Sequence, residues 1–428
     1  MKLEADDLGF LKELAEATVS ASRVQPGERV GNSPANTMGF AVIRPGGREC
    51  YPAYWIRDFA MSIASGFISQ DEIVNHVRLS LRTQNGGSER KLKSGAIVPA
   101  SAIADHVNFD GGAVFYPGTM SAGEDQGGEP FGVLPPGDDQ YWVIAAAAAV
   151  KNRDFLGERI GGVPVIDRLN WGFAAAESDP STGGMFTTSE PRRAVGFGFC
   201  DTVYLTGAIL FPSLLRYVAA TQLSQMRGSR GVRADEKEFR ETAESVASHI
   251  PLIFRDPQAG HGWLLAATGV GRQPDVWGTL YALHLKILPD DIASRARRTI
   301  ADAVRRGTIT SQGAVRHIPT EFDASPTTAW ERVAPGVAKG TYQNGAYWHT
   351  PTGWLVEALS VEHEDLAHHV FGDYISHLRG HDFRKEPAHG APFECFTKDM
   401  GASQNPVYTT SVTVPYAVLR DLNEYGAR

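Results

Sequence analysis

Six short polar clusters divide the chain, and each stands at the start of a stretch with helical apolar periodicity. Their spacing is regular, about 60 to 80 residues, the length of two helices plus long connecting loops. The clusters are Trp55-Ile56-Arg57-Asp58, Asp138-Asp139-Gln140-Tyr141-Trp142, Cys200-Asp201-Thr202-Val203-Tyr204, Asp275-Val276-Trp277-Gly278, Tyr342-Gln343-Asn344-Gly345-Ala346-Tyr347-Trp348 and Pro406-Val407-Tyr408-Thr409-Thr410. This repeat predicts a barrel of helical hairpins whose inner helices all begin at one end, where the polar clusters gather.

Helical periodicity occurs at twelve places, and the stretches alternate in character. Those that follow the clusters are apolar and rich in Ala, whereas the intervening ones carry Lys, Arg and Glu, as inner and outer rings should. The predicted helices are 7–20, 58–69, 71–83, 139–151, 165–177, 202–222, 234–254, 276–287, 290–306, 346–360, 363–379 and 409–423. We therefore predict an all-α (α/α)6 barrel, in one domain spanning residues 1–428, with the first helix as the outer partner of the last.

The connections carry weaker signals. Short hairpin strands are expected at Val42-Ile43, Ala96-Ile97-Val98 and 314–318. Pro212 should kink or break the helix predicted over 202–222. The longest loop runs over 94–137, and a structureless loop of that length is usually a lid or a binding rim.

Composition excludes several classes of protein. Lys plus Arg total 41 against 49 for Asp plus Glu, and no basic run occurs, so we expect no nucleic-acid partner. No apolar run is long enough for a membrane span, and the acidic start does not resemble a signal peptide, so we expect a cytoplasmic protein. Three cysteines form no disulfide framework, and zinc-ligand spacings do not occur. We expect neither a metal nor a cofactor, and the oligomeric state stays open.

Carboxylates at the predicted starts of inner helices are the main candidates for chemistry. They are Asp58, Asp138, Asp139, Asp201 and Asp275. Each could instead be an N-cap, which accepts hydrogen bonds from the first-turn N–H groups. Their aromatic neighbours favour a functional role, because rings beside charged groups hold a sugar by its apolar face and its hydroxyls. Cleavage of a glycosidic bond needs two carboxyl groups, one to protonate the leaving oxygen and one to activate water.

Two of the clusters resemble motifs of the six-hairpin glycosidase superfamily, which includes trehalases, processing glucosidase I, glucoamylases and bacterial rhamnosidases. Trp55-Ile56-Arg57-Asp58 is similar to the family's Trp-x-Arg-Asp element, and 342–348 is similar to its Tyr-x-Asn-Gly-x-x-Trp segment. The resemblance implies that Arg57 and Asp58 hold sugar hydroxyls. It also implies Asp201 as the general acid and Glu394 as the general base, although Phe396 stands where the family has Tyr.

The remaining pocket candidates follow from their place in the clusters. We expect the substrate site to include Tyr54, Trp55, Arg57, Asp58, Asp138, Asp139, Trp142, Asp275, Trp277, Gln343, Asn344, Trp348 and His349. Glu394 stands between Phe393 and Cys395, and apolar surroundings raise the pKa of a carboxyl group. Asp139, Asp275 and Glu331 stay open as alternative members of the catalytic pair.

These features favour a glycoside hydrolase that acts on the end of a short oligosaccharide or glycoconjugate. The long loop would close one end of the groove and favour exo action, and the resemblance implies inversion. One alternative is an oligosaccharide or polysaccharide lyase on the same barrel, with a Tyr or His such as Tyr347 or His349 acting beside an Arg. The other is a sugar-binding protein without catalysis. The sequence leaves the sugar, the linkage and the anomer undetermined.

Overall fold

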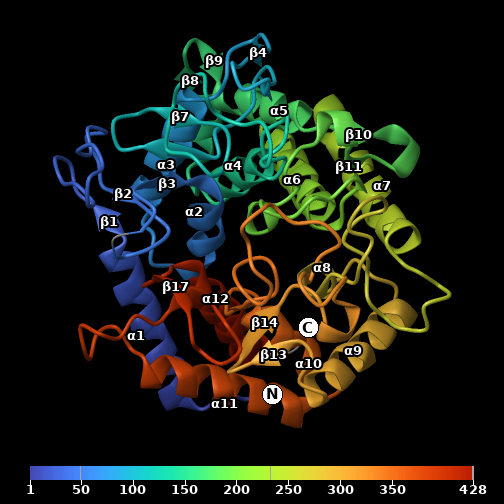
Figure 1. Ribbon diagram of the computed structural model, residues 1–428. Helices are drawn as coiled ribbons and strands as arrows, with labels where there is room; N and C mark the ends of the chain where they lie inside the picture. The colour runs from blue at the N-terminus through green and yellow to red at the C-terminus, as the bar shows by residue number, and fades with distance from the viewer. Residues whose placement is uncertain (49, 232, 427–428) are drawn as a thin grey trace.

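The computed structural model describes residues 1–48, 50–231 and 233–426. In this part of the chain twelve α-helices form two concentric rings, seen along the barrel axis in Figure 1. The inner ring consists of α2 (Ile56–Ser62), α4 (Asp139–Ala148), α6 (Leu210–Ser229), α8 (Val276–His284), α10 (Thr352–Ser360) and α12 (Thr410–Tyr425). Each inner helix contacts the next, and α12 contacts α2, so the ring is closed.

The outer ring supplies a second layer of helices. It consists of α1 (Ala5–Ala21), α3 (Gln70–Arg82), α5 (Val165–Ala175), α7 (Arg233–Ile253), α9 (Asp290–Arg305) and α11 (Glu364–Gly380). α1 packs on α12, α3 and α5 on α4, α7 on α6, and α9 and α11 on α10. The predicted all-α (α/α)6 barrel is therefore confirmed, including the pairing of the first helix with the last.

The two rings differ in composition because they differ in burial. In α8 every residue from Val276 to Leu283 is buried. In α9 apolar residues such as Ile292, Ala296 and Ile300 face inward, and charged residues occupy the opposite face. Among the described helices, none combines the length and apolar composition that a membrane crossing requires.

Short antiparallel strands join the loops at one end of the barrel. The largest sheet has the order β13 (Thr310–Ser311), β14 (Ala314–Arg316), β15 (Tyr347–Trp348), β16 (Phe393–Phe396) and β17 (Ser403–Pro406). It ties the segment before α10 to the segment before α12, because Tyr347 of β15 pairs with Phe396 of β16.

Two three-stranded sheets and three hairpins complete the strands. The sheets are β3 (Ala53–Trp55), β6 (His106–Asn108) and β7 (Ala113–Val114), and β10 (Ser178–Asp179), β11 (Met185–Thr188) and β12 (Gly207–Ala208). The hairpins are β1 (Arg23–Val24) with β2 (Val42–Ile43), β4 (Arg90–Lys91) with β5 (Ile97–Val98), and β8 (Arg159–Ile160) with β9 (Val163–Pro164). The three predicted strands coincide with β2, β5 and β14.

Three expectations about the connections are wrong. The loop over 94–137 is not structureless, because it contains β5, β6 and β7. Helix α6 begins at Leu210 rather than near Thr202, so Pro212 lies in its first turn and breaks nothing. A first-turn N–H has no partner within its helix, and Pro is therefore tolerated there. Helix α10 begins at Thr352 rather than Ala346, because Tyr347-Trp348 joins the sheet instead.

Close packing of the inner ring gives a test of the architecture. A Cβ atom on Gly353 of α10 would lie 2.9 Å from Cα of Pro415 and 3.0 Å from Cβ of Val418, both in α12. We expect Gly353→Ala to lower the free energy of unfolding by about 1–3 kcal/mol, because the two helices must separate. Gly372 of α11 has open space around a Cβ, so Gly372→Ala should raise it by about 0.5–1 kcal/mol. Urea unfolding of both variants checks this, and a Gly353→Ala variant as stable as the parent would contradict the α10–α12 contact.

Candidate active site

A small cavity lies where the segments leading into the inner helices meet. Its volume, including the space at its mouth, is about 290 Å³. It is lined by Tyr51, Trp55, Arg57, Asp58, Gly198, Phe199, Asp201, Tyr342, Glu394 and Tyr408. These residues come from the segments before or at the start of α2, α6, α10 and α12, so the expected gathering at one end holds for four inner helices. The clusters before α4 and α8 contribute no lining residue.

Arg57 lies in the first turn of α2, and its side chain forms hydrogen bonds with three buried carboxylates. Its Nε donates to Asp138 (2.7 Å), and its Nη2 donates to Asp105 (3.1 Å), Asp138 (3.2 Å) and Asp139 (2.9 Å). Asp105 also bonds His106 at 2.7 Å. The remaining nitrogen, Nη1, has no hydrogen bond within the described residues, and the side chain lines the cavity. Nη1 is therefore the donor that Arg57 offers to a ligand.

Asp58 lies beside this donor, and one of its two carboxylate oxygens accepts a side-chain hydrogen bond. Its Oδ1 accepts a hydrogen bond of 2.6 Å from the Tyr408 hydroxyl, which crosses the cavity wall from the loop before α12. Burial raises the pKa of Asp58 to about 6, against the opposing effects of Tyr408 and Arg57. Arg57 and Asp58 together place a donor and an acceptor side by side, which suits two adjacent hydroxyl groups.

Glu394 reaches the cavity from the middle of strand β16 and is 2% exposed. Both its oxygens lie within hydrogen-bonding distance of the Tyr51 hydroxyl, at 2.8 and 2.9 Å, and Oε2 also accepts from the amide of Asn405. Burial raises the pKa of Glu394 to about 8; the Asn405 and Tyr51 donors oppose this, and the negative charges of Asp58 and Asp201 add to it.

Asp201 lies in a turn, nine residues before α6 begins, directly after the short 3-10 helix Gly198–Cys200. Its Oδ1 is buried and has no hydrogen-bond partner among the described residues. Burial raises the pKa of Asp201 to about 7, and the amide of Gln343 opposes the rise. The negative charge of Asp201 is in turn one of the causes that raise the pKa of Glu394.

The backbone around Glu394 is held in a sparsely populated conformation. Tyr51 and Tyr342 line the cavity with φ of +51° and +41°, and Asn405, which bonds Glu394, has φ of +45°. Residues other than Gly rarely adopt such values, and those that do concentrate at functional sites. The surrounding contacts therefore hold the backbone of these three residues in an unfavourable conformation, and this conformation sets the directions of their side chains.

Aromatic rings form much of the remaining wall. Trp55 stacks on His106 with centroids 4.2 Å apart and meets the edge of Tyr51 at 4.9 Å. Gly198 is required opposite Arg57, because a Cβ there would overlap the guanidinium group. The result is a cavity with rings on its sides and carboxyl groups at Asp58, Asp201 and Glu394.

Several residues predicted for the pocket lie outside its lining. Asp138 and Asp139 instead bind Arg57, and the Trp142 indole donates to Asp138 at 3.0 Å. Tyr54 turns away from the cavity, because neighbouring residues of a strand face opposite sides, and its hydroxyl bonds Ser80. Asp275 is an N-cap that accepts from Gly278 N at 2.8 Å.

The candidates near α8 and α10 are also buried behind the cavity. Trp277 and Trp348 are fully buried and meet edge to face at 5.9 Å. Asn344 holds its own loop, accepting from Ala329 N at 2.8 Å. His349 is buried with its Nε2 bonded to the Gln312 carbonyl, so it cannot meet a ligand in the cavity. Gln343 contacts the Asp201 turn but does not line the cavity.

Glu331, one of the alternative members of the catalytic pair, also lies outside the cavity lining. Its Oε2 accepts from Gly271 N at 2.7 Å, away from the cavity lining. Within the described residues no group of three or more His, Cys, Asp or Glu side chains could hold a metal ion. The cavity therefore brings together Asp58, Asp201 and Glu394 as its acids.

Several residues that line the cavity were not among the site residues predicted from the sequence. Tyr342 and Tyr408 stood within the clusters, and Phe199 directly precedes the third, but none was singled out. Tyr51 belongs to no cluster, and Asp105 and Asn405 lie in loops without a motif. A search for polar residues shortly before each cluster could have found Tyr51, six residues before Arg57.

Comparison with known proteins places the fold. No protein-family model matches the chain, and no curated protein matches it. Among solved structures, a glucoamylase from Saccharomycopsis fibuligera is similar with a TM-score of 0.58 and 12% identity, over 99% of this chain and 97% of that one. The GH63 mannosylglycerate hydrolase from Thermus thermophilus, in complex with glucose, gives a TM-score of 0.53 and 11% identity, over 95% and 99% of the chains.

A further structure, described as a wild-type glycosidase, gives a TM-score of 0.53 and 13% identity over 99% of both chains. These matches are to (α/α)6-barrel proteins along almost the whole chain. The likeness confirms the (α/α)6-barrel fold.

The raised pKa of Glu394 predicts a pH-dependent stability. In the unfolded chain Glu has a pKa of 4.5, and in the fold about 8, so between these values the unfolded chain releases a proton that the fold retains, and the fold loses stability as pH rises. We expect Glu394→Gln to gain stability relative to the parent, by about 3 kcal/mol, between pH 5 and pH 8. Denaturant unfolding at the two pH values measures this gain.

Exposed Glu16 provides the control, since it makes no ion pair or side-chain hydrogen bond with any residue that the structure describes, and Glu16→Gln should track the parent at both pH values. A Glu394→Gln variant whose stability relative to the parent is independent of pH would mean that Glu394 is already ionised at low cost.

Proposed function

We propose that the protein is a glycoside hydrolase that removes a single terminal sugar from an oligosaccharide or glycoconjugate. The observation that carries the proposal is the meeting of Asp201 and Glu394 in one cavity that also holds the Arg57–Asp58 pair. They are 193 residues apart in sequence, and the fold similarity to proteins described as glycosidases supports the same reading.

The size of the cavity supports exo action. Its volume of about 290 Å³ includes the space at its mouth, so the enclosed part is smaller still. That space suits one sugar ring rather than a chain of rings. Trp55 and the cavity tyrosines present faces to the ring, while Arg57 Nη1 and the Asp58 carboxylate offer partners to its hydroxyls.

The hydrogen bonds around the two carboxyl groups support an assignment of roles. Glu394 receives donors from Tyr51 and Asn405, and donors stabilise the ionised form that a base requires. Asp201 leaves its buried Oδ1 without a donor, which favours the protonated form that an acid requires. Burial raises both pKa values, that of Glu394 to about 8 and that of Asp201 to about 7, so the assignment of roles rests on the hydrogen bonds and not on the order of these values.

In the proposed reaction Asp201 gives its proton to the glycosidic oxygen as the bond to the anomeric carbon breaks. Glu394 takes a proton from a water molecule, whose oxygen attacks the anomeric carbon from the opposite face. The products are a sugar of inverted configuration and an alcohol, and the proton on Glu394 returns to Asp201 through solvent. Inversion follows the family that the chain resembles and requires space for water between the carboxyl groups.

The structure disfavours the lyase. Cleavage of a uronate by elimination needs a cation to neutralise the sugar carboxylate, yet the one cation among the described lining residues is Arg57. Arg57 already bonds three carboxylates, and Asp58, Asp201 and Glu394 add negative charge beside it. A binding protein without catalysis has no need for buried carboxyl groups with raised pKa values, which are typical of catalytic sites.

Leaving-group dependence tests the assignment. We expect Asp201→Asn to lower kcat/KM about 10²–10⁴-fold on a natural disaccharide, because the leaving oxygen is no longer protonated. On a dinitrophenyl glycoside, whose leaving group needs little protonation, the loss should be about tenfold or less. Glu394→Gln should lower kcat/KM on both substrates by similar factors, because water must be activated whichever leaving group departs.

Asp275→Asn serves as the matched control, since Asn also caps a helix and Asp275 lies outside the cavity lining. It should leave both rates near those of the parent. The proposal is overturned if folded Asp201→Asn and Glu394→Gln keep near-normal rates on every substrate that the parent hydrolyses.

A further inference from the structure

Gln343 is a fully buried amide that spans the turn carrying Asp201. Its Oε1 accepts from both N and Oγ1 of Thr202, each at 2.7 Å, and its Nε2 donates to the Gly198 carbonyl at 3.1 Å. The amide therefore holds the residues on both sides of Asp201. It also lies close enough to the Asp201 carboxyl to favour its ionised form.

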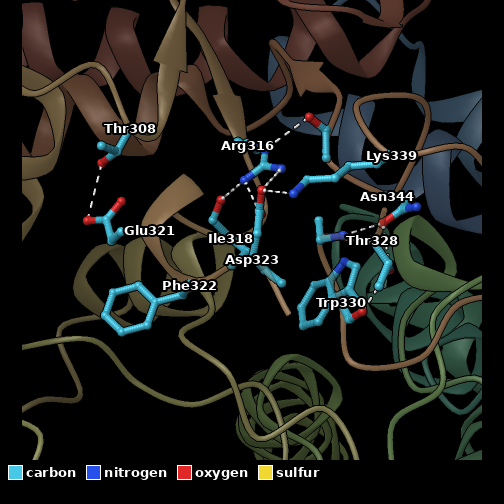
Figure 2. A network of polar contacts seen from close by, with 12 residues as sticks. Thr308, Arg316, Ile318, Glu321, Phe322, Asp323, Thr328, Trp330, Lys339 and Asn344 are labelled. Atoms are coloured by element: carbon cyan, nitrogen blue, oxygen red, sulfur yellow. Dashed lines mark hydrogen bonds and ion pairs between the residues drawn. The ribbon is translucent and has the colours of Figure 1, made fainter. Parts of the chain in front are cut away.

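The loop that contains Gln343 is held by a cluster of ion pairs around Arg316 and Asp323, shown in Figure 2. Arg316 donates from Nη1 to Asp323 at 2.7 Å and to the Ile318 carbonyl at 3.0 Å, and Lys339 bonds Asp323 at 2.8 Å. Arg316 Nε also donates to the Gly345 carbonyl, two residues beyond Gln343, at 3.0 Å. This cluster pins both ends of the loop.

The centre of the loop is fixed as well. Trp330 is fully buried, and its indole donates to the Gln343 carbonyl at 3.0 Å. Asn344 bonds Ala329 N and the Val337 carbonyl, each at 2.8 Å (Figure 2 labels Trp330 and Asn344). Gln343 thus has little freedom of its own, and its amide can act as a rigid support.

We propose that Gln343 is a positioning residue, which sets the direction and the proton affinity of Asp201 by holding the turn over 198–202. This inference rests on the proposed function, in which Asp201 is the proton donor. Gln343 is not among the residues that line the cavity, so it acts through the turn over 198–202.

The test compares Gln343→Leu with a matched amide in the same part of the fold. Gln273 donates to the Phe322 and Ala329 carbonyls, at 2.8 and 2.9 Å, and accepts from Glu331 N at 2.7 Å. It therefore supports the same loop without touching the Asp201 turn. Gln273→Leu should lower stability but leave the pattern of activity unchanged.

For Gln343→Leu we expect kcat/KM to fall at least about tenfold more on a natural disaccharide than on a dinitrophenyl glycoside. The alkaline limb of the pH–rate profile should move to higher pH, because a donor that favours ionised Asp201 is lost. Thermal unfolding of both variants at temperatures above that of the assay confirms that each is folded.

Equal losses on both substrates with an unmoved alkaline limb would overturn the inference and leave Gln343 a structural residue. The same result for Gln273→Leu as for Gln343→Leu would overturn it too. Asp201→Asn separates the failure of this inference from a failure of the proposed function. If Asp201→Asn lowers kcat/KM equally on both substrates, the proposed function is wrong, whatever Gln343→Leu shows.

Discussion

The buried contact between Arg57 and three aspartates is the constraint on which the cavity depends. Taking a guanidinium group out of water is costly unless its donors are paired, and here Asp105, Asp138 and Asp139 pair two of its three nitrogens. Asp105 directly precedes β6, and Asp138 and Asp139 lie at the start of α4, so the ion cluster also ties these two segments to α2. Removal of one partner would leave an uncompensated buried charge.

The cluster also explains why conspicuous acids are absent from the cavity wall. Asp138 and Asp139 stand at the start of an inner helix, where a catalytic group was expected, yet they support Arg57 from behind. Their burial leaves one Arg57 donor facing the cavity. Support by several carboxylates fixes the guanidinium plane, and a fixed plane discriminates between hydroxyl positions better than a mobile one.

The second constraint is strain in the backbone near Glu394. Tyr51, Tyr342 and Asn405 all have positive φ, and together they surround this carboxyl group or hold it. Each such residue costs about 1–3 kcal/mol, which the large sheet and the inner ring must offset. Glu394 itself lies in that sheet, in β16, where neighbouring strands on both sides hold the segment that carries the proposed base.

The sequence predicted the architecture well, because helical periodicity and the apolar inner stretches are local properties of the chain. All twelve helices exist, although α6 and α10 begin later than predicted. The site was predicted less completely. Arg57, Asp58, Asp201 and Glu394 line the cavity, whereas Asp139, Asp275 and Asn344 serve the structure.

The misses have a common physical cause. A carboxylate at a helix start can face a cavity, cap the helix or pair with a neighbour, and only tertiary contacts decide which. Asp275 caps α8, and Asp139 meets an Arg that lies 82 residues earlier in the chain. Tyr51 and Asn405 reach Glu394 through loops whose conformation no periodicity encodes.

The central claim is that Asp201 and Glu394 act on one sugar from opposite faces. Proton NMR of the first product formed from a substrate of known anomeric configuration tests it most directly, because the anomers are resolved before they interconvert. The account predicts that the released sugar first appears as the opposite anomer. Release with the original configuration would contradict it, since retention requires a carboxylate to attack the anomeric carbon itself.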